Sequence, residues 1–97
     1  YVLDFNRQAI DERMTRLARF LGLPNPGFKA VLDWVLRLRK EINIPHTLRA
    51  IGVDDKRIDE VALAAEADPS AGGNPIKVGR VELGKIFVAG LNGNLAA

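Results

Sequence analysis

Residues 26–42 read PGFKAVLDWVLRLRKEI, and their apolar side chains recur at spacings of three and four. This spacing places a stripe of apolar residues along one face of a helix. The stripe consists of Phe28, Val31, Leu32, Val35, Leu38 and Ile42. Trp34 and Leu36 widen the apolar surface beyond the stripe, so we expect this helix to need neighbours on several sides.

Both ends of this helix carry their own signals. Asn25 can cap the first turn, and Pro26 suits the first helical position because its missing N–H would have no partner there. Cations near the C-terminal end meet the negative end of the helix dipole. They are Arg37, Arg39 and Lys40. The expected helix therefore covers about residues 26–42.

Another helix is expected on the N-terminal side, over residues 8–21. Its apolar face consists of Ile10, Met14, Leu17 and Leu21. These side chains are three or four residues apart, which predicts one buried face. Gly22 follows, and glycine suits the left-handed residue that ends a helix.

The second half of the chain predicts one helical turn and two helices. Thr47 can cap a turn over residues 47–51, and Gly52 stops it. Asp54 is the expected N-cap of the next helix, which ends at residues 68–69. Its inward side chains are Ile58, Val61, Ala62 and Ala65.

The last helix is expected over about residues 80–90, and residues 90–94 should fray. Gly84 lies inside this helix and weakens it, because glycine has a low helix propensity. No alternating strand pattern is present in the chain. The predicted class is therefore all-α, a small domain with four main helices.

The composition fits one globular domain. The chain has 97 residues, of which 47% are hydrophobic and 27% are charged, so it can bury a single core. The absence of cysteine excludes disulfides and thiolate zinc sites, and we expect a cytoplasmic location. No apolar run approaches the roughly eighteen residues of a membrane span. The start has neither an initiator Met nor a signal pattern, so we expect a piece of a longer protein.

Three sets of polar residues could in principle bind a ligand, but each has a simpler structural interpretation. The acidic group lacks the spacing of a calcium loop and suits a helix start. It comprises Asp54, Asp55, Asp59 and Glu60. His46 has no second histidine at helical spacing and is expected on the surface. Arginines on the first two helices could contact DNA, but acidic residues lie among them and the net charge is only +2. We therefore expect no nucleic-acid partner.

Residues 68–75 are the least regular segment. The adjacent Gly72 and Gly73 allow backbone conformations that other residues avoid, and such loops are often where ligands approach. No lysine follows at P-loop spacing and no strand precedes, so this is not a phosphate loop. From these residues alone, a ligand loop and a plain connector stay equally open.

Three segments, in this order and at this spacing, resemble the C-terminal part of the iron-containing (group III) alcohol dehydrogenases, which have a dehydroquinate synthase-like fold. They are residues 1–6, residues 45–53, and residues 68–75 with the helix that follows. The resemblance covers nearly the whole chain. Gly79 and Gly84 depart from the family pattern, in which capping and helix-favouring residues are more usual.

The resemblance implies a parent enzyme with an N-terminal dinucleotide-binding domain and a C-terminal helical domain. Such an enzyme interconverts an alcohol and an aldehyde or ketone by hydride transfer, using NAD(P) and a divalent metal, Fe²⁺ or Zn²⁺. The family's metal ligands and its NAD(P) turn would lie upstream of Tyr1. Residues 1–97 would then be the C-terminal portion of the helical metal-binding domain, with no catalytic, metal or cofactor residue, and inactive when isolated.

The resemblance also places Ser70 beside the substrate, with Gly72, Gly73 and Asn74 shaping the loop. The implied partners are the remainder of the parent and a small alcohol or aldehyde, and a homo-oligomer stays open. The substrate, NAD against NADP, and iron against zinc also stay open. So does a related branch, such as a glycerol dehydrogenase or a maleylacetate reductase, although residues 68–75 favour the alcohol dehydrogenases.

An alternative from another class is a free-standing helical module. It would bind a partner helix through the wide apolar face around Trp34 and Leu36. The sequence upstream of Tyr1 distinguishes the two, because only the enzyme needs a dinucleotide fold and metal-binding histidines there.

Overall fold

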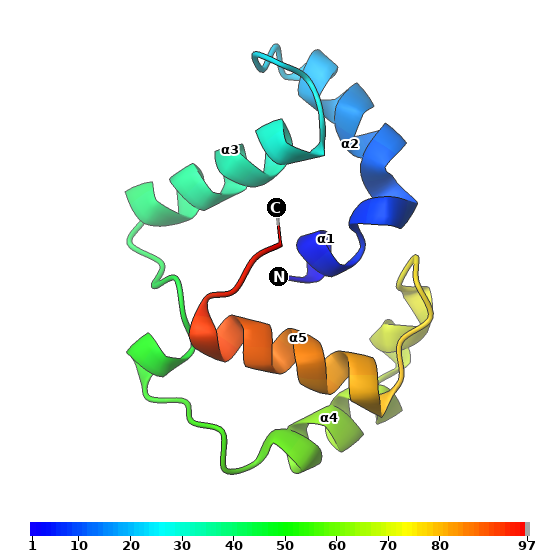
Figure 1. Cartoon of the computed structure of the whole chain (residues 1–97), viewed down its shortest axis with the longest axis vertical. Coiled ribbons are helices and arrows are strands. Elements are labelled where there is room, and N and C mark those ends of the chain that lie inside the picture. Colours follow the sequence, from blue (N-terminus) through cyan, green and yellow to red (C-terminus); the bar gives the residue numbers. More distant parts are fainter. Residues whose placement is uncertain (97) are drawn as a thin grey trace.

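The computed structural model describes residues 1–96, which form five α-helices, two short 3₁₀ helices and no strand (Figure 1). The elements are α1 (Val2–Phe5), α2 (Arg7–Phe20), α3 (Phe28–Glu41), η1 (Arg49–Ile51), α4 (Ile58–Ala67), η2 (Pro69–Gly73) and α5 (Arg80–Asn92). The predicted all-α class is confirmed. Ala97, the last residue of the predicted unit, lies outside the described residues.

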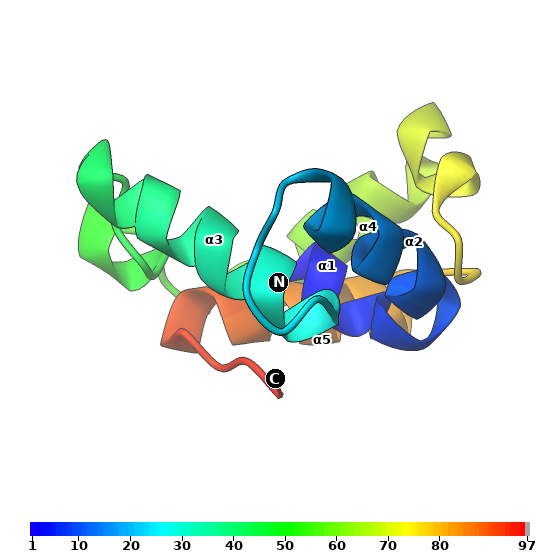
Figure 2. The ribbon, with the colours of Figure 1, turned by 90° about the horizontal axis from the view of Figure 1, so that it is seen from above.

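The long helices pack in two pairs, α2 against α3 and α4 against α5. Figure 1 shows the two pairs at opposite ends of the molecule, with α1 between them. Figure 2 shows the thin side of the same arrangement, whose principal dimensions are 41 × 29 × 20 Å. The backbone N–H of Ala96 donates to Asp4 Oδ2 (2.7 Å), so the C-terminal segment returns to α1.

The core is small and lies mainly between α2 and α3. Ile10, Phe28 and Leu32 are buried together in one cluster. Partly buried side chains pack against this cluster from α1, α2 and α3; they are Leu3, Met14 and Leu36. In the other pair Ala62 and Leu91 are buried. Burial of these apolar side chains supplies most of the stabilising free energy.

Within residues 1–96, α3 is covered on one side only. Leu36, which was predicted to lie off the main stripe, packs against the core. Trp34, Leu38 and Ile42 remain 37%, 39% and 57% exposed. The wide apolar surface predicted from the sequence is therefore present, and the described residues leave part of it uncovered.

The start of α3 differs from the prediction. The helix begins at Phe28, and its N-cap is Gly27 instead of Asn25. Asn25 adopts a left-handed conformation with φ 49°, which turns the chain before the helix begins. Pro26 consequently precedes the helix and does not occupy its first position.

The start of α4 also differs, because the predicted cap makes a tighter turn. Asp54 Oδ1 accepts a hydrogen bond from the backbone N–H of Lys56 (2.9 Å). The helix then begins only at Ile58, with Arg57 as its N-cap. A short aspartate side chain can bond to the backbone two residues later, and this turn competes with helix capping.

The two ends of the chain are more helical than predicted. No helix was expected over Val2–Phe5, which forms α1. At the other end α5 continues to Asn92 and does not fray, because Leu91 is 1% exposed and the N–H of Leu48 donates to Gly90 O (2.9 Å). Gly93 ends the helix in the left-handed conformation, with φ 76°.

Other predicted stop signals are confirmed. Gly22 and Gly52 have positive φ angles of 66° and 86°, just after α2 and η1. Thr47 Oγ1 accepts a hydrogen bond from the N–H of Ala50 (3.1 Å), as expected for a residue that caps a turn.

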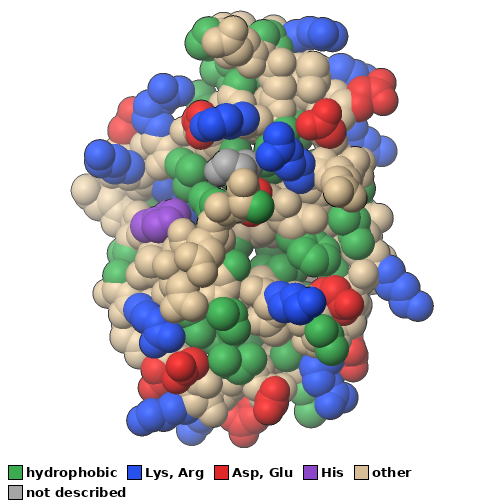
Figure 3. All heavy atoms as spheres, in the orientation of Figure 1, with side chains coloured by type: hydrophobic (Ala, Val, Ile, Leu, Met, Phe, Trp, Pro, Cys, Tyr) green, Lys and Arg blue, Asp and Glu red, His purple; other side chains and the backbone are tan. Residues whose placement is uncertain are grey.

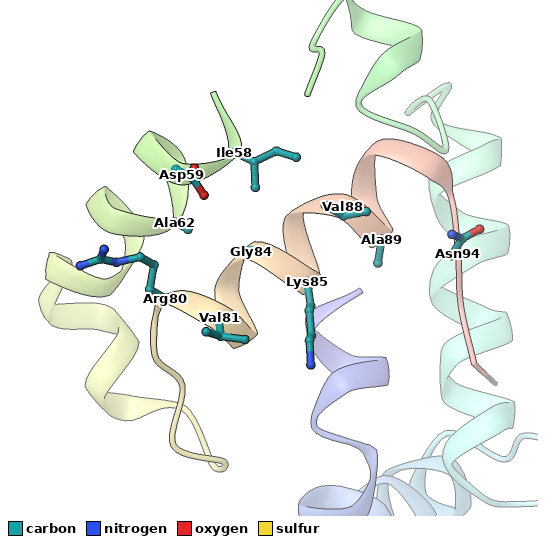
Figure 4. Close-up of a pocket in the computed structure, with 10 residues that line it drawn as sticks. All are labelled: Ile58, Asp59, Ala62, Arg80, Val81, Gly84, Lys85, Val88, Ala89 and Asn94. Atoms are coloured by element: carbon teal, nitrogen blue, oxygen red, sulfur yellow. The ribbon is translucent and has the colours of Figure 1, made fainter. Parts of the chain in front are cut away.

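Gly84 lies where α5 packs against α4 (Figure 4). A Cβ atom there would be 3.8 Å from Ala62 Cβ and 3.9 Å from Ile58 Cγ2, which are ordinary contact distances. We expect Gly84→Ala to raise the free energy of unfolding by about 0.5–1 kcal/mol, because alanine favours the helix and one methyl fits. Gly84→Leu should lower it by about 1–3 kcal/mol, because a larger side chain overpacks the contact.

Urea denaturation followed by circular dichroism at 222 nm measures both changes. If Gly84→Ala lowered the stability, α4 and α5 would pack too closely at this position to accept a methyl group.

Candidate functional site

The loop of residues 68–75 has more regular structure than predicted. Residues Pro69–Gly73 form the 3₁₀ helix η2, and Pro69 occupies its first turn. Asp68 caps this helix, since its Oδ1 accepts a hydrogen bond from the N–H of Ser70 (2.7 Å). The expected irregular turn is therefore corrected to a capped helical turn.

The same contact affects the acidity of Asp68. Hydrogen bonds from the Ser70 backbone, and then from its side chain, lower the pKa of the Asp68 carboxyl below its usual value, because the ionised form accepts them better. A lowered pKa means that the stabilising contribution is fully present above the ordinary pKa of an aspartate. It is lost as the pH falls through the pKa of the folded state.

The other end of the loop is tied to the start of the chain. Asn6 Nδ2 donates to Asn74 Oδ1 (2.7 Å), and Asn74 Nδ2 donates to Asn6 Oδ1 (2.8 Å). Asn74 Nδ2 also donates to Ile76 O (2.6 Å). Among residues 1–96, Asn6 is the one buried polar residue, with 4% exposure. Both ends of the loop are thus held by side-chain hydrogen bonds.

The four residues predicted for a substrate loop lie together in this segment. Ser70, Gly72 and Gly73 are exposed, and Asn74 is half-buried. A Cβ atom at Gly72 or Gly73 would meet open space, so packing within residues 1–96 does not require glycine at either position. This open space leaves room for a ligand or for another part of a longer polypeptide.

Two carboxylates fix the backbone where the loop leads into α5. Glu82 Oε2 accepts from the N–H of Gly79 (2.8 Å), and Glu66 Oε2 accepts from the N–H of Arg80 (2.6 Å). A Cβ atom at Gly79 would lie only 3.3 and 3.4 Å from these oxygens, so glycine lets both carboxylates approach. Hydrogen bonds from the backbone of Glu82 and Gly79 lower the pKa of Glu82.

A cavity of about 630 Å³, which we call the central cavity, lies between α1, residues 44–51, α4 and α5. Its lining includes Tyr1, Leu48, Ile51, Val61, Leu83 and Phe87. Figure 3 shows hydrophobic side chains in this middle part of the molecule. A void of this size is unusual in a close-packed interior. The cavity is therefore an apolar surface that residues 1–96 leave open, and none of the four predicted loop residues lines it.

A second cavity of about 490 Å³ lies between α4 and α5, with Ala62 and Gly84 among its lining residues (Figure 4). Asp59 from α4 and Lys85 from α5 also line it. Both of these charged side chains are exposed, so they lie at the solvated rim of the cavity. This cavity also lacks the four predicted loop residues.

His46 belongs to a cluster that joins three distant segments. The hydroxyl of Tyr1 donates to His46 O, and Arg39 Nη2 donates to Pro45 O (3.1 Å). The Arg39 guanidinium lies 5.8 Å from the centroid of the Tyr1 ring, as in a cation–π contact. His46 Nε2 lies 3.1 Å from Gly93 O. His46 is exposed, as predicted, and its contacts are structural.

The described part of the chain does not fit the metal that the resemblance implies. Residues 1–96 contain no group of three His, Cys, Asp or Glu side chains close enough to hold a metal ion. In the acidic group, Asp55 Oδ2 lies 3.5 Å from Arg49 Nη2, and Glu60 Oε2 lies 3.6 Å from Arg57 Nε. These carboxylates therefore make local ion pairs.

No helix within residues 1–96 has both the length and the apolar character needed to cross a membrane.

Comparison with known proteins finds a matching protein family and two related enzymes. The model of the C-terminal part of the Fe-containing alcohol dehydrogenase family matches residues 1–91. NADPH-dependent butanol dehydrogenase of Clostridium saccharobutylicum is 30% identical over 95 residues, covering 90% of this chain and 24% of that protein. Lactaldehyde reductase of Escherichia coli (strain K12) is 31% identical over 81 residues, covering 77% of this chain and 21% of that protein. The chain thus spans about a quarter or less of these relatives.

Proposed function

Because the chain belongs to the Fe-containing alcohol dehydrogenase family, we propose that it is the C-terminal portion of the helical domain of an NAD(P)-dependent, metal-dependent alcohol dehydrogenase. The parent interconverts an alcohol and an aldehyde or ketone by hydride transfer. The observation that carries the proposal is the family match over residues 1–91. The names of the two relatives, which refer to butanol and lactaldehyde, support a small substrate.

In the parent, this segment supplies scaffold and a loop at the substrate pocket. Ser70 lies beside the substrate, and Gly72, Gly73 and Asn74 shape the loop. Two observations support this role: hydrogen bonds hold the loop at Asp68 and Asn74, and Ser70 between them is exposed. Hydrogen bonds on both sides of Ser70 keep this residue in a fixed position for contact with a substrate.

The metal, iron or zinc, and NAD(P) are held by the remainder of the parent. The absence of a cluster of three metal ligands among residues 1–96 supports this part of the proposal. Under the proposal, hydride transfer uses groups from outside the segment, and we expect the isolated chain to be inactive. The lack of cysteine fits a reducing compartment, and we place the parent in the cytoplasm.

The remainder of the parent also packs on the apolar surface that residues 1–96 leave open. The central cavity offers about 630 Å³ of space. On α3 and its C-cap, three apolar side chains are at least one-third exposed: Trp34, Leu38 and Ile42. Covering such a surface stabilises the parent by roughly 25 cal/mol per Å² of apolar area.

The exposed side chains of α3 also favour the alternative, a free-standing module that binds a partner helix through Trp34. The two proposals differ in what precedes residue 1. A dinucleotide-binding fold followed by metal-binding histidines supports the enzyme, and a polypeptide without them supports the module.

The full-length protein that contains this segment tests the enzyme. Loaded with Fe²⁺ or Zn²⁺, it is expected to reduce NAD⁺ or NADP⁺ in the presence of butan-1-ol, measured as absorbance at 340 nm. Chelation should abolish the activity, and added metal should restore it. A folded, metal-loaded protein that oxidises no alcohol with either cofactor would contradict the proposal, as would activity of the isolated 97-residue chain.

A further inference from the structure

We propose that Asn6 is a positioning residue for the substrate loop and acts through Asn74. The inference rests on the proposed function, because it concerns the same loop that carries Ser70. Asn6 lies on none of the predicted apolar helix faces and lines neither of the two cavities described above.

The two amides form a reciprocal pair. Asn6 Nδ2 lies 2.7 Å from Asn74 Oδ1, and Asn74 Nδ2 lies 2.8 Å from Asn6 Oδ1. Each side chain is therefore donor and acceptor to the other, which uses both functions of the amide. A pair of this kind fixes the relative orientation of the two groups as well as their distance.

Asn6 is a rigid anchor because it joins two helices, as the C-cap of α1 and the N-cap of α2. Its N–H donates to the carbonyl of Val2, the first residue of α1 (3.0 Å), and its own carbonyl accepts from the N–H of Ala9 in α2 (2.9 Å). The residue is 4% exposed. The loop is consequently tied to helical backbone, and not to another loop.

Asn74 connects Asn6 to the rest of the loop. Its backbone N–H donates to Ala71 O (3.2 Å), which closes the last turn of η2. Its side chain also donates to Ile76 O (2.6 Å). Without Asn6, the loop keeps the cap at Asp68 but loses the bonds that hold its far end to the helices. A loosened loop no longer holds Ser70 in one position beside the substrate, so the alcohol binds more weakly and its KM rises.

The test uses the full-length protein, with Asn6→Ala as the variant and Asn92→Ala as the matched control. Asn92 Oδ1 accepts a hydrogen bond from Arg49 Nε (3.1 Å) at the other end of α5. Steady-state kinetics with ethanol, butan-1-ol and hexan-1-ol are combined with hydrogen–deuterium exchange of peptides covering residues 69–76.

Asn6→Ala is expected to raise KM for butan-1-ol on the order of tenfold, as for the loss of two neutral hydrogen bonds. The KM for NAD(P) should not change, and residues 69–76 should exchange faster. Asn92→Ala should change none of these quantities. A purely structural role for Asn6 would instead reduce the amount of folded protein and leave both KM values unchanged.

A double-mutant cycle shows whether Asn6 acts through Asn74. Adding Asn6→Ala to Asn74→Ala should raise KM little further, because both changes remove the same pair. Asn6→Ser keeps a short polar side chain with one donor and one acceptor, and it introduces no charge at this buried position. It should raise KM less than Asn6→Ala, and it carries the test if the alanine variant does not fold.

The outcomes distinguish a failure of the proposed function from a failure of the inference about Asn6 alone. A wild-type protein that oxidises no alcohol would overturn the proposed function and this inference with it. An active wild type combined with unchanged KM in Asn6→Ala and Asn6→Ser would overturn only the inference. Additive effects of Asn6→Ala and Asn74→Ala would also overturn it, because the two residues would then act independently.

Discussion

Replacing Phe28 by alanine is expected to lower the free energy of unfolding by about 3–5 kcal/mol. Phe28 is 3% exposed and packs in one cluster with Ile10 and Leu32. The Arg7 guanidinium lies 5.1 Å from the centroid of its ring, which adds a cation–π contact. Domains are typically stable by only about 5–15 kcal/mol. Because this core is small, we expect the variant to be largely unfolded at 37 °C.

Phe20→Ala is the matched control, since Phe20 also belongs to this helix pair but is 87% exposed. Its effect should stay within about 0.5 kcal/mol, as for most surface changes. Urea denaturation followed by circular dichroism at 222 nm compares the two variants. Equal stabilities would show that Phe28 is not the centre of the core.

The helices α2 and α3 could be predicted from the sequence because their apolar spacing is a local property. Residues 8–21 and 26–42 were expected, and the structure has Arg7–Phe20 and Phe28–Glu41. The end of α5 could not be predicted in this way. Leu48 lies more than forty residues from Gly90, and only the fold shows that their contact holds the last turn.

Helix starts were harder, because the residues that cap helices also form turns. Asn25 could cap α3, but asparagine also tolerates positive φ, and the structure has φ 49° there. Asp54 could cap α4, but its side chain bonds to Lys56 instead. A single residue type therefore allows both outcomes, and packing further along the chain selects one of them.

The candidate site could also be predicted only in part, because some of its contacts join residues far apart in the sequence. Ser70, Gly72, Gly73 and Asn74 were predicted from a resemblance between sequences, and their role in substrate binding stays a prediction. The anchor of the loop required the structure, because Asn6 and Asn74 are 68 residues apart. The only sign in the sequence was a polar residue between Phe5 and the apolar face of α2.

Replacing Ser70 by tryptophan in the full-length enzyme is expected to raise KM by roughly ten- to a hundredfold for hexan-1-ol, and less for ethanol. Ser70 is exposed on η2, so the larger side chain can be accommodated in this segment without filling its core. In the proposed pocket it would occupy space that a longer alcohol needs. Under the proposed function the remainder of the parent holds the metal and NAD(P), so KM for NAD(P) should stay unchanged.

Ala64→Trp places the same side chain on an exposed position of α4, outside the loop, and should leave the kinetics unchanged. Melting temperatures of both variants separate pocket effects from effects on folding. If the loop were only a connector, Ser70→Trp would reduce activity equally for every alcohol, or not at all. An increase in KM that grows with alcohol length requires contact with the substrate, because a loss of folded enzyme lowers the apparent kcat for all substrates alike.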